Sequence, residues 1–593
     1  MSSPPGFAAV SAAAGHRPPA LAAAATSVEP AALCDGAPAG LQTATWGTDG
    51  PLVEGRTLVL SQELRRRNLV IEPEDVARML ARRDKNALAE MLPTFGAVHH
   101  AGSALLATTD ALGFRHLYYR VGDGWAAVST SARVLAGLAP TSLDHDGLAV
   151  QSLLGWQLRG RSLFESVTKV PAGRSVEIRD GLLRLDAFTD DLGDQQDGHR
   201  VGIADAVASM SSMLRGYLSS YLDDHPDAIL QLTGGQDSRL LLSAIEPRRR
   251  RGLRVVTLGR PDSPDVRIAA DLARRYGMRH EIISVDGLDT LQPEEAYARC
   301  AAAAGAIELG ADPLAWAALD FAEARATPGP RISGLGGEVA RGFYYLGRDG
   351  DGPVTEARAR RLADWRMFVN EAVELSALRP EFREHAREVA HADVLTTLAD
   401  GGRPWFEATD ELYLGQRMQH WAGATESPVS ARRRIVNPML DDRWIANSRA
   451  LVPADKAGSR FLARLQVELD VDLARLPLEG RPSPATYVTP GWRSTWRRGA
   501  TTVAKAGRKL GQRVRHRSRP PVGGEILADA VVRHWRTYPD ALLALAGGQV
   551  VEPSWIDDVV AGRHQPGPST VAFMLNLSLA TDAVRGSGLT AAR

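Results

Sequence analysis

Short apolar runs separated by turn residues characterise the first 190 positions of the chain. The runs fall into three pairs: 94–98 with 104–108, 117–121 with 125–128, and 176–178 with 183–185. The second pair flanks Gly122-Asp123-Gly124, which is typical of a hairpin turn. Residues 144–154 have the pattern of a helix. The pattern predicts a first domain of mostly antiparallel sheet with a few helices, preceded by a small N-terminal strand and a loop.

Strand and helix patterns alternate after a polar stretch at 190–199, which is typical of a linker. A long helix is expected at 201–222. Three strands are expected at 228–232, 253–258 and 280–283, with helices at 238–246 and 265–276 between them. Apolar strands that alternate with helices indicate a parallel sheet covered by helices on both faces. Beyond about residue 355 the pattern is largely helical.

The composition excludes several classes of protein. With 593 residues, 44% hydrophobic and 24% charged, the chain is neither wholly disordered nor fibrous. No apolar stretch reaches the roughly 18 residues of a membrane-spanning helix, so no membrane partner is expected. Seventy basic residues balance seventy acidic ones, which argues against a specific nucleic-acid binder. Cys34 and Cys300 are the only cysteines, which excludes a disulfide framework and a cysteine-built zinc site.

The N-terminal stretch lacks the charged start and continuous apolar core of a signal peptide, so a cytoplasmic location is expected. The patterns divide the chain into residues 1–195, 196–490 and 491–593. The last part carries a block of ten basic residues at 493–519: Arg493, Arg497, Arg498, Lys505, Arg508, Lys509, Arg513, Arg515, Arg517 and Arg519. Such runs are often only solvated surface. The alternative is an electrostatic dock for an acidic peptide or carrier.

The most informative motif is Thr233-Gly234-Gly235-Gln236-Asp237-Ser238, which follows an apolar strand and opens a helix. Two glycines allow the backbone to approach a ligand closely. Free N–H groups in the loop and at the start of the helix suit an anion. Thr233 and Ser238 add hydroxyl donors, and Asp237 offers the oxygen ligands that Mg²⁺ prefers. The motif therefore predicts a phosphate-binding loop.

This loop resembles the pyrophosphate-binding loop of ATP pyrophosphatases, SGGxDS in its common form. The wider pattern, over about residues 90–485, is similar to the asparagine synthetase superfamily, which includes asparagine synthetases, β-lactam synthetases and lasso-peptide cyclases. The further matching segments are 109–119, 170–173, 256–259, 263–265, 332–338 and 437–441. The resemblance implies an α/β protein. An Ntn-hydrolase-like antiparallel α+β domain of glutaminase type would precede a parallel-sheet, HUP-like ATP-pyrophosphatase synthetase domain with a helical C-terminal part.

The resemblance also implies the residues of the site. In the family the acid of a second loop, here Ser333 to Glu338, binds metal, so Asp237 and Glu338 would hold Mg²⁺. Arg481 follows a Leu-Pro pair where the family places a phosphate-contacting lysine, and its guanidinium fork suits phosphate. An ordinary surface arginine is the alternative. Asp237, Glu338 and Arg481 are thus the expected catalytic residues. The expected ATP-binding residues are Leu232, Thr233, Gly234, Gly235, Gln236, Asp237, Ser238, Thr257, Leu258, Gly334, Leu335 and Gly336.

The first domain departs from the family in its glutaminase chemistry. The family uses a cysteine as the mature first residue, whereas here Met1 is followed by Ser2, and neither an RGPD sequence nor an Asn-Gly pair occurs. We therefore expect a scaffold that no longer hydrolyses glutamine. Leu335 also stands where asparagine synthetases carry a glutamate and β-lactam synthetases carry the tyrosine of a catalytic pair, so that general base is absent.

These features predict ATP-dependent amide-bond formation through an acyl-adenylate, with release of pyrophosphate and AMP. The expected enzyme is a biosynthetic amide ligase or cyclase that acts on a small-molecule or peptide carboxylate and an amine. Two alternatives stay open: an asparagine synthetase that uses ammonia, and a non-catalytic nucleotide-binding scaffold.

Overall fold

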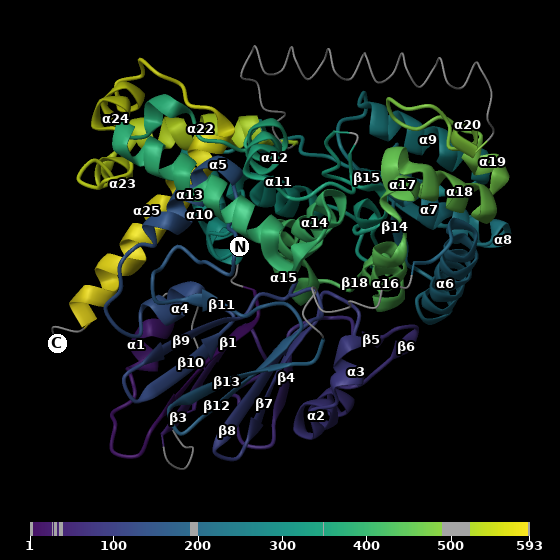
Figure 1. Ribbon diagram of the computed structural model, residues 1–593. Helices are drawn as coiled ribbons and strands as arrows, with labels where there is room; N and C mark the ends of the chain where they lie inside the picture. The colour runs from purple at the N-terminus through teal and green to yellow at the C-terminus, as the bar shows by residue number, and fades with distance from the viewer. Residues whose placement is uncertain are drawn as a thin grey trace.

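The computed structural model describes residues 4–26, 28, 32–34, 40–189, 200–347, 349–488 and 522–590. The expected linker at 190–199, the basic block at 493–519 and Ser2 lie outside the described residues. Figure 1 shows the antiparallel sheets of the N-terminal part below, with the parallel sheet and the helical remainder above them.

Two antiparallel sheets form the centre of the N-terminal part. The first has the strand order β11-β9-β10-β1-β3-β2 and the second has the order β13-β12-β8-β7-β4. Apolar side chains of both sheets, among them Phe7, Leu105, Val128 and Ile178, meet in a shared core. The strands are β1 (Gly6–Ala12), β2 (Ala32–Cys34), β3 (Leu41–Trp46), β4 (Thr57–Val59), β7 (Gly96–Ala101), β8 (Ala104–Thr109), β9 (Tyr118–Gly122), β10 (Trp125–Ser129), β11 (Thr168–Lys169), β12 (Arg174–Arg179) and β13 (Leu182–Ala187).

Helices cover the outer faces of this pair of sheets. On the second sheet, α2 (Pro73–Arg82) packs on β4, β7 and β8. On the first sheet, α1 (Leu21–Ala25) and α4 (Ala132–Ala136) pack on β1, β3, β9 and β10. The layers therefore run helices, sheet, sheet, helices. A small hairpin of β5 (Arg65–Arg66) and β6 (Leu69–Val70) and the helix α3 (Lys85–Ala89) complete this part.

The three hairpins predicted from the apolar runs are confirmed, because β7–β8, β9–β10 and β12–β13 are antiparallel neighbours. The helix expected at 144–154 is α5 (His145–Leu154). The first turn is tighter than predicted, since His99 and His100 continue β7 and leave only Gly102 and Ser103 as the turn. The N-terminal strand is longer than expected: β1 has seven buried residues and lies between β10 and β3.

A five-stranded parallel sheet with the order β16-β15-β14-β17-β18 forms the centre of the second part. The three predicted strands are β14 (Ile229–Gln231), β15 (Arg254–Leu258) and β16 (Arg279–Ile283). The structure adds β17 (Arg331–Ile332) and β18 (Ile435–Val436). The crossover helices are α7 (Gln236–Ala244), α9 (Pro264–Tyr276), α10 (Pro293–Ala306) and α11 (Pro313–Glu323), and α6 (Ile203–Asp224) precedes the sheet.

The remaining chain is helical and packs against both parts. It includes α12 (Glu356–Leu362), α13 (Pro380–Ala399), α14 (Trp405–Leu412), the π-helix η6 (Tyr413–Ala422), α15 (Gly423–Arg432), α16 (Asp442–Ala450), α18 (Arg460–Leu469), α22 (Gly524–Thr537), α24 (Pro553–Val560) and α25 (Pro568–Thr590). The helix α22 packs on α10 and α11, whereas α25 also reaches α4 and α5 of the N-terminal part (Figure 1). One continuous apolar core joins these helices to both parts of the chain. Within the described ranges, no helix is long and apolar enough to span a membrane.

Candidate functional site

The topology of the parallel sheet creates a crevice between the carboxyl ends of β14 and β17. These two strands are neighbours, but the chain leaves β14 toward β15 and leaves β17 toward β18, on the opposite side. Ligands of open α/β sheets bind at such a switch point, because the loops diverge there. The loop from Thr233 to Gly235 follows β14, and the loop from Ser333 to Gly336 follows β17. Both predicted motifs therefore lie at the switch point.

The two loops are in close contact although about 100 residues separate them in the sequence. A Cβ atom added to Gly334 would lie 3.0 Å from the backbone nitrogen of Ser238. Gly336 has a φ of +100°, and a Cβ there would lie 2.6 Å from Leu440 Cδ2. Gly336 therefore meets both a conformational and a packing requirement that glycine alone satisfies. Leu335 packs against the core and offers no polar group to the crevice.

The first loop is held by its own side chains. The backbone N–H of Thr233 donates to Ser238 Oγ at 3.1 Å, and the N–H of Gly235 donates to Thr233 Oγ1 at 3.1 Å. The N–H of Gly234 donates to Asp265 Oδ1 at 2.6 Å. Gly235 precedes α7 and has no side chain to cap it, so no side chain caps the first turn of this helix. The positive end of the α7 dipole thus faces the crevice, which suits a phosphate group.

Asp237 and Glu338 form a buried carboxylate pair beside these loops, with side-chain exposures of 17% and 24%. Burial and the neighbouring charge of Glu338 raise the pKa of Asp237 to about 7. Arg341 joins the pair: its Nη1 lies 3.4 Å from Asp237 Oδ2 and its Nη2 donates to Glu338 Oε1 at 2.8 Å. The other oxygen, Asp237 Oδ1, is buried and accepts no hydrogen bond from any described residue.

Arg481 reaches the same place from the segment after α18. The N–H of Glu479 donates to the carbonyl of Gly234 at 2.9 Å, which holds this segment against the first loop. Burial lowers the pKa of Arg481, and so does the nearby charge of Arg341, whereas Asp237 and Glu338 oppose this effect. The structure therefore brings together Asp237, Glu338 and Arg481, the three residues expected to be catalytic.

Arg239, two residues beyond Asp237, does not face the crevice openly. Its side chain is fully buried, and its Nη2 donates to the carbonyl of Pro477 at 3.3 Å. Its Nε and Nη1 have no hydrogen-bond partner among the described residues, and burial lowers the pKa of Arg239 to about 10. This arginine supports the segment that carries Arg481.

A cavity of about 230 Å³ opens from the first loop between the sheet and the helices α11 and α15. Its walls include Thr233 of the loop and apolar side chains of two strands: Val256 and Leu258 of β15 and Ile283 at the end of β16. Ligand pockets commonly span about 300–1,000 Å³, so this cavity suits one small group rather than a whole nucleotide. Thr233 belongs both to the cavity lining and to the first loop, so the cavity borders that loop.

Polar and charged side chains also line this cavity. They are Gln231, Asp320, Glu323, Glu426, Arg432 and Arg433. One oxygen of Glu426 accepts a hydrogen bond from Asn437 Nδ2 at 3.2 Å, and burial raises the pKa of Glu426 to about 7. Thr257 was expected to contact a nucleotide, but its hydroxyl donates to the carbonyl of Leu232 at 2.6 Å and lies 2.9 Å from His280 Nε2. Leu258, in contrast, lines the cavity.

The carboxylate pair fits Mg²⁺ bound together with phosphates. Among the described residues, no group of three or more His, Cys, Asp or Glu side chains is placed to hold a metal ion. Mg²⁺ commonly takes one or two protein carboxylates and completes its octahedron with phosphate oxygens and waters. The buried, unpartnered Asp237 Oδ1 is the acceptor that such an ion would use first.

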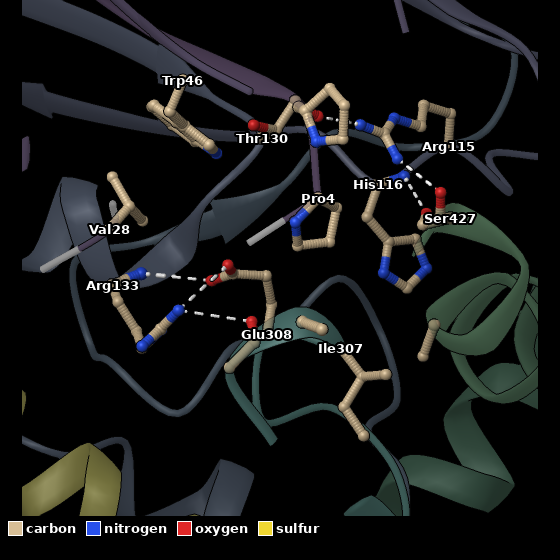
Figure 2. Close-up of a pocket in the computed structure, with 14 residues that line it drawn as sticks. Pro4, Val28, Trp46, Arg115, His116, Thr130, Arg133, Ile307, Glu308 and Ser427 are labelled. Atoms are coloured by element: carbon tan, nitrogen blue, oxygen red, sulfur yellow. Dashed lines mark hydrogen bonds and ion pairs between the residues drawn. The ribbon is translucent and has the colours of Figure 1, made fainter. Parts of the chain in front are cut away.

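A second, much smaller cavity of about 30 Å³ lies at the junction of the two parts, next to Pro4 and Pro5. Figure 2 shows Arg115 turned toward Ser427 on α15 and Arg133 turned toward Glu308, while the backbone N–H of His116 donates to Ser427 Oγ at 3.0 Å. Arg115 donates to the carbonyls of Ser427 at 2.6 Å and Pro5 at 2.8 Å, which closes the junction. This space corresponds to roughly one water molecule, whose share of liquid volume is about 30 Å³.

Comparison with known proteins adds little. No protein-family model matches the chain, and no curated protein matches it. Among solved structures, the chain is similar to one described as the allosteric regulatory enzyme of purine biosynthesis, with 11% identity, a TM-score of 0.19, and coverage of 47% of this chain and 75% of that one. It is also similar to glutamine phosphoribosylpyrophosphate amidotransferase from B. subtilis complexed with ADP and GMP, with 10% identity, a TM-score of 0.18, and coverage of 47% and 60%. At such TM-scores neither likeness bears on the activity.

Two residues of the site were not expected from the sequence, Arg341 and Glu426. Arg341 lies three residues after Glu338 in a short 3₁₀ segment, η2 (Gly337–Arg341). In a 3₁₀ helix, side chains three residues apart lie over one another, so the spacing of three residues is itself a signal that Arg341 lies beside Glu338. Glu426 has no such local signal, because only the packing of α15 on the sheet brings it to the cavity.

Proposed function

We propose that this chain binds ATP with Mg²⁺ at the switch point and uses it to activate a carboxylic acid for amide-bond formation. The observation that carries the proposal is the meeting of the Thr233–Ser238 loop, the Ser333–Glu338 loop and the partly buried carboxylate pair. Thr233 of the first loop also lines the cavity of about 230 Å³. A nucleobase in that cavity would leave its phosphates at Thr233 and the start of α7. A pocket beside a helix N-terminus that suits an anion supports a nucleotide as the ligand.

The side chains have distinct roles in this proposal. Asp237 and Glu338 hold Mg²⁺, which when bound neutralises phosphate charge. A substrate carboxylate oxygen attacks the α-phosphorus, the bond to the β-phosphate oxygen breaks, and pyrophosphate leaves toward the α7 N-terminus and Arg481. The amine nitrogen then attacks the acyl carbon, loses a proton, and displaces AMP. The protein contributes position and fixed charge, which are the larger part of catalysis in phosphate chemistry.

The amine in this proposal is free ammonia or an amine carried by a substrate. The junction cavity of about 30 Å³ has no cysteine among its described lining residues. Its two hydroxyl side chains are also engaged, since Ser427 Oγ donates to the carbonyl of Phe114 at 2.7 Å and Thr130 Oγ1 to that of Phe7 at 3.4 Å. An amine on the substrate favours a biosynthetic ligase or cyclase. Asparagine synthesis from aspartate and ammonia is the alternative reaction.

Exchange of labelled pyrophosphate into ATP, measured with a panel of carboxylic acids that includes aspartate and peptide acids, tests this proposal. We expect exchange that depends on Mg²⁺ and on one class of acid. Aspartate as that acid would favour asparagine synthesis. Tight ATP binding without exchange for any acid would overturn the proposal in favour of a nucleotide-binding scaffold.

A further inference from the structure

Arg341 occupies an unusual position, because it bonds to both members of the expected metal-binding pair. Its guanidinium lies 3.4 Å from Asp237 Oδ2 and donates to Glu338 Oε1 at 2.8 Å. Its side chain is only 17% exposed, so this is not a loose surface ion pair. The short 3₁₀ segment η2 fixes Arg341 above Glu338, and Gly337 of the same segment packs against Asp237. The bridge is therefore built into the second loop.

A guanidinium and a divalent cation compete for these oxygens. Mg²⁺ needs oxygen ligands at about 2.0–2.1 Å in near-octahedral geometry. Asp237 Oδ1 is buried without a hydrogen bond from the described residues, whereas Asp237 Oδ2 and Glu338 Oε1 face Arg341. A metal ion shared by both carboxylates would lie within a few ångströms of the Arg341 guanidinium, so the two like charges would repel each other.

We propose, on the basis of the proposed function, that Arg341 is a built-in counter-cation of the Asp237–Glu338 pair, displaced when metal and nucleotide arrive together. Metal alone gives the released guanidinium no new partner. Metal that arrives with ATP brings phosphate oxygens next to Arg341 and Arg481, and the guanidinium fork binds phosphate in bidentate geometry. The exchange of partners couples metal binding to nucleotide binding, and Arg341 acts as a positioning residue that selects the metal–nucleotide complex over the free ion.

Binding of Mn²⁺ tests this inference, because Mn²⁺ favours the same oxygen ligands as Mg²⁺ and its free form is measured directly by electron paramagnetic resonance. The variant is Arg341→Gln, which removes the competing charge. The matched control is Arg366→Gln, because Arg366 is a neighbouring arginine that donates to the carbonyl of Phe343 at 2.7 Å and to neither carboxylate. We expect Arg341→Gln to bind Mn²⁺ alone about tenfold more tightly than the wild type and Mn²⁺ with ATP about tenfold more weakly. Arg366→Gln is expected to match the wild type in both titrations.

Mn²⁺ binding by Arg341→Gln that is no tighter than in the wild type would overturn the inference. If that variant does not fold, as judged by circular dichroism and thermal melting, Arg341→Lys replaces it. Lysine keeps the charge but is a point donor that cannot bridge both carboxylates as a fork does, so we expect a smaller tightening, about threefold. No tightening there would overturn the inference as well.

These titrations need no carboxylic acid substrate, so they are independent of the exchange assay. Failure of the wild type to exchange pyrophosphate would reject the proposed function and leave the Mn²⁺ comparison standing. Pyrophosphate exchange by the wild type, together with unchanged Mn²⁺ affinity in Arg341→Gln, would reject only the role of Arg341.

Discussion

Two buried lysines differ in whether a carboxylate balances their charge, and this difference allows a quantitative prediction about stability. Lys169 and Lys456 are 1% and 3% exposed. Lys456 donates to Asp410 Oδ2 at 2.8 Å, whereas Lys169 has no carboxylate partner among the described residues and lies 2.9 Å from His420 Nδ1. His116, whose Nε2 donates to the carbonyl of Gln419 at 2.7 Å, is also close. This basic cluster joins β11 to the π-helix η6, across the junction of the two parts.

Burial lowers the pKa of Lys169 from 10.5 to about 7. The unfolded chain therefore binds a proton that the folded chain releases between pH 7 and 10.5, so this group lowers stability progressively as the pH falls through that window. Each pKa unit corresponds to about 1.4 kcal/mol, which gives a cost of roughly 5 kcal/mol at pH 7. Burial also lowers the pKa values of His116 and His420, so their cost is added below about pH 6.5.

Replacing Lys169 with methionine removes this cost and also removes the hydrogen bond to His420. The lost bond and the unpaired His420 nitrogen together cost about 3 kcal/mol. Lys169→Met should therefore be about 2 kcal/mol more stable than the wild type at pH 7, equally stable near about pH 8.5, and less stable at pH 9.5. Urea unfolding followed by tryptophan fluorescence at the three pH values measures this difference.

Lys456→Met is the control, because it leaves Asp410 as an unpaired buried charge. It should be destabilised by about 3–5 kcal/mol at neutral pH. The reasoning would be refuted if Lys169→Met were destabilised at pH 7 as much as Lys456→Met, or if its difference from the wild type did not change between pH 7 and pH 9.5.

Three further predictions concern other features of the chain. Gly336→Ala should lose pyrophosphate exchange and about 2 kcal/mol of stability, because Gly336 has a φ of +100° and the added Cβ would contact Leu440. Gly347→Ala is the control: Gly347 has a φ of +92°, but no atom lies within 4 Å of the added Cβ, so this variant should keep exchange. The wild type should release no glutamate from glutamine, since Ser2 stands where a glutaminase would have its cysteine and the chain has no RGPD sequence; glutamate release that disappears in Ser2→Ala would contradict this. The basic block should attract an acidic acceptor, and salt should screen this attraction over a length of about 8–10 Å. Replacement by Gln of four residues, Arg508, Lys509, Arg513 and Arg515, should therefore raise the acceptor's KM and flatten its salt dependence. Adenylation of a small acid should be unchanged. No change in the acceptor's KM would identify the block as solvated surface.

Much of the architecture could be predicted from local pattern. The hairpins and the strands β14 to β16 have apolar runs of several residues, which periodicity detects. The strands β17 and β18 have only two residues each, Arg331–Ile332 and Ile435–Val436, and too short a run gives no periodic signal. Their place in the sheet depends on pairing with β14 and with each other, which is a tertiary property.

The residues of the site also divide into those that could be expected from the sequence and those that only the fold brings together. Asp237 was expected from the glycine-rich loop before it and Glu338 from the resemblance of the second loop to a known family, and the order of the strands explains why the two loops meet. Lys169 and His420 are 251 residues apart, and no local pattern relates them. Glu426 likewise reaches its cavity only because α15 packs over the ends of β14 and β15. Interactions between distant segments are the part of this molecule that the sequence does not reveal.

The measurement that tests the central claim most directly is pyrophosphate exchange by Asp237→Asn, with the acid that supports exchange in the wild type. This substitution keeps the size of the side chain but removes one charge of the carboxylate pair. A folded variant should lose exchange by about 10²–10³-fold, the range for removal of one group that stabilises developing charge. Asp262→Asn is the control, since Asp262 has an 81% exposed side chain on the surface after β15, and it should exchange like the wild type. Wild-type exchange by Asp237→Asn would contradict the assignment of the switch point as the site of carboxylate activation.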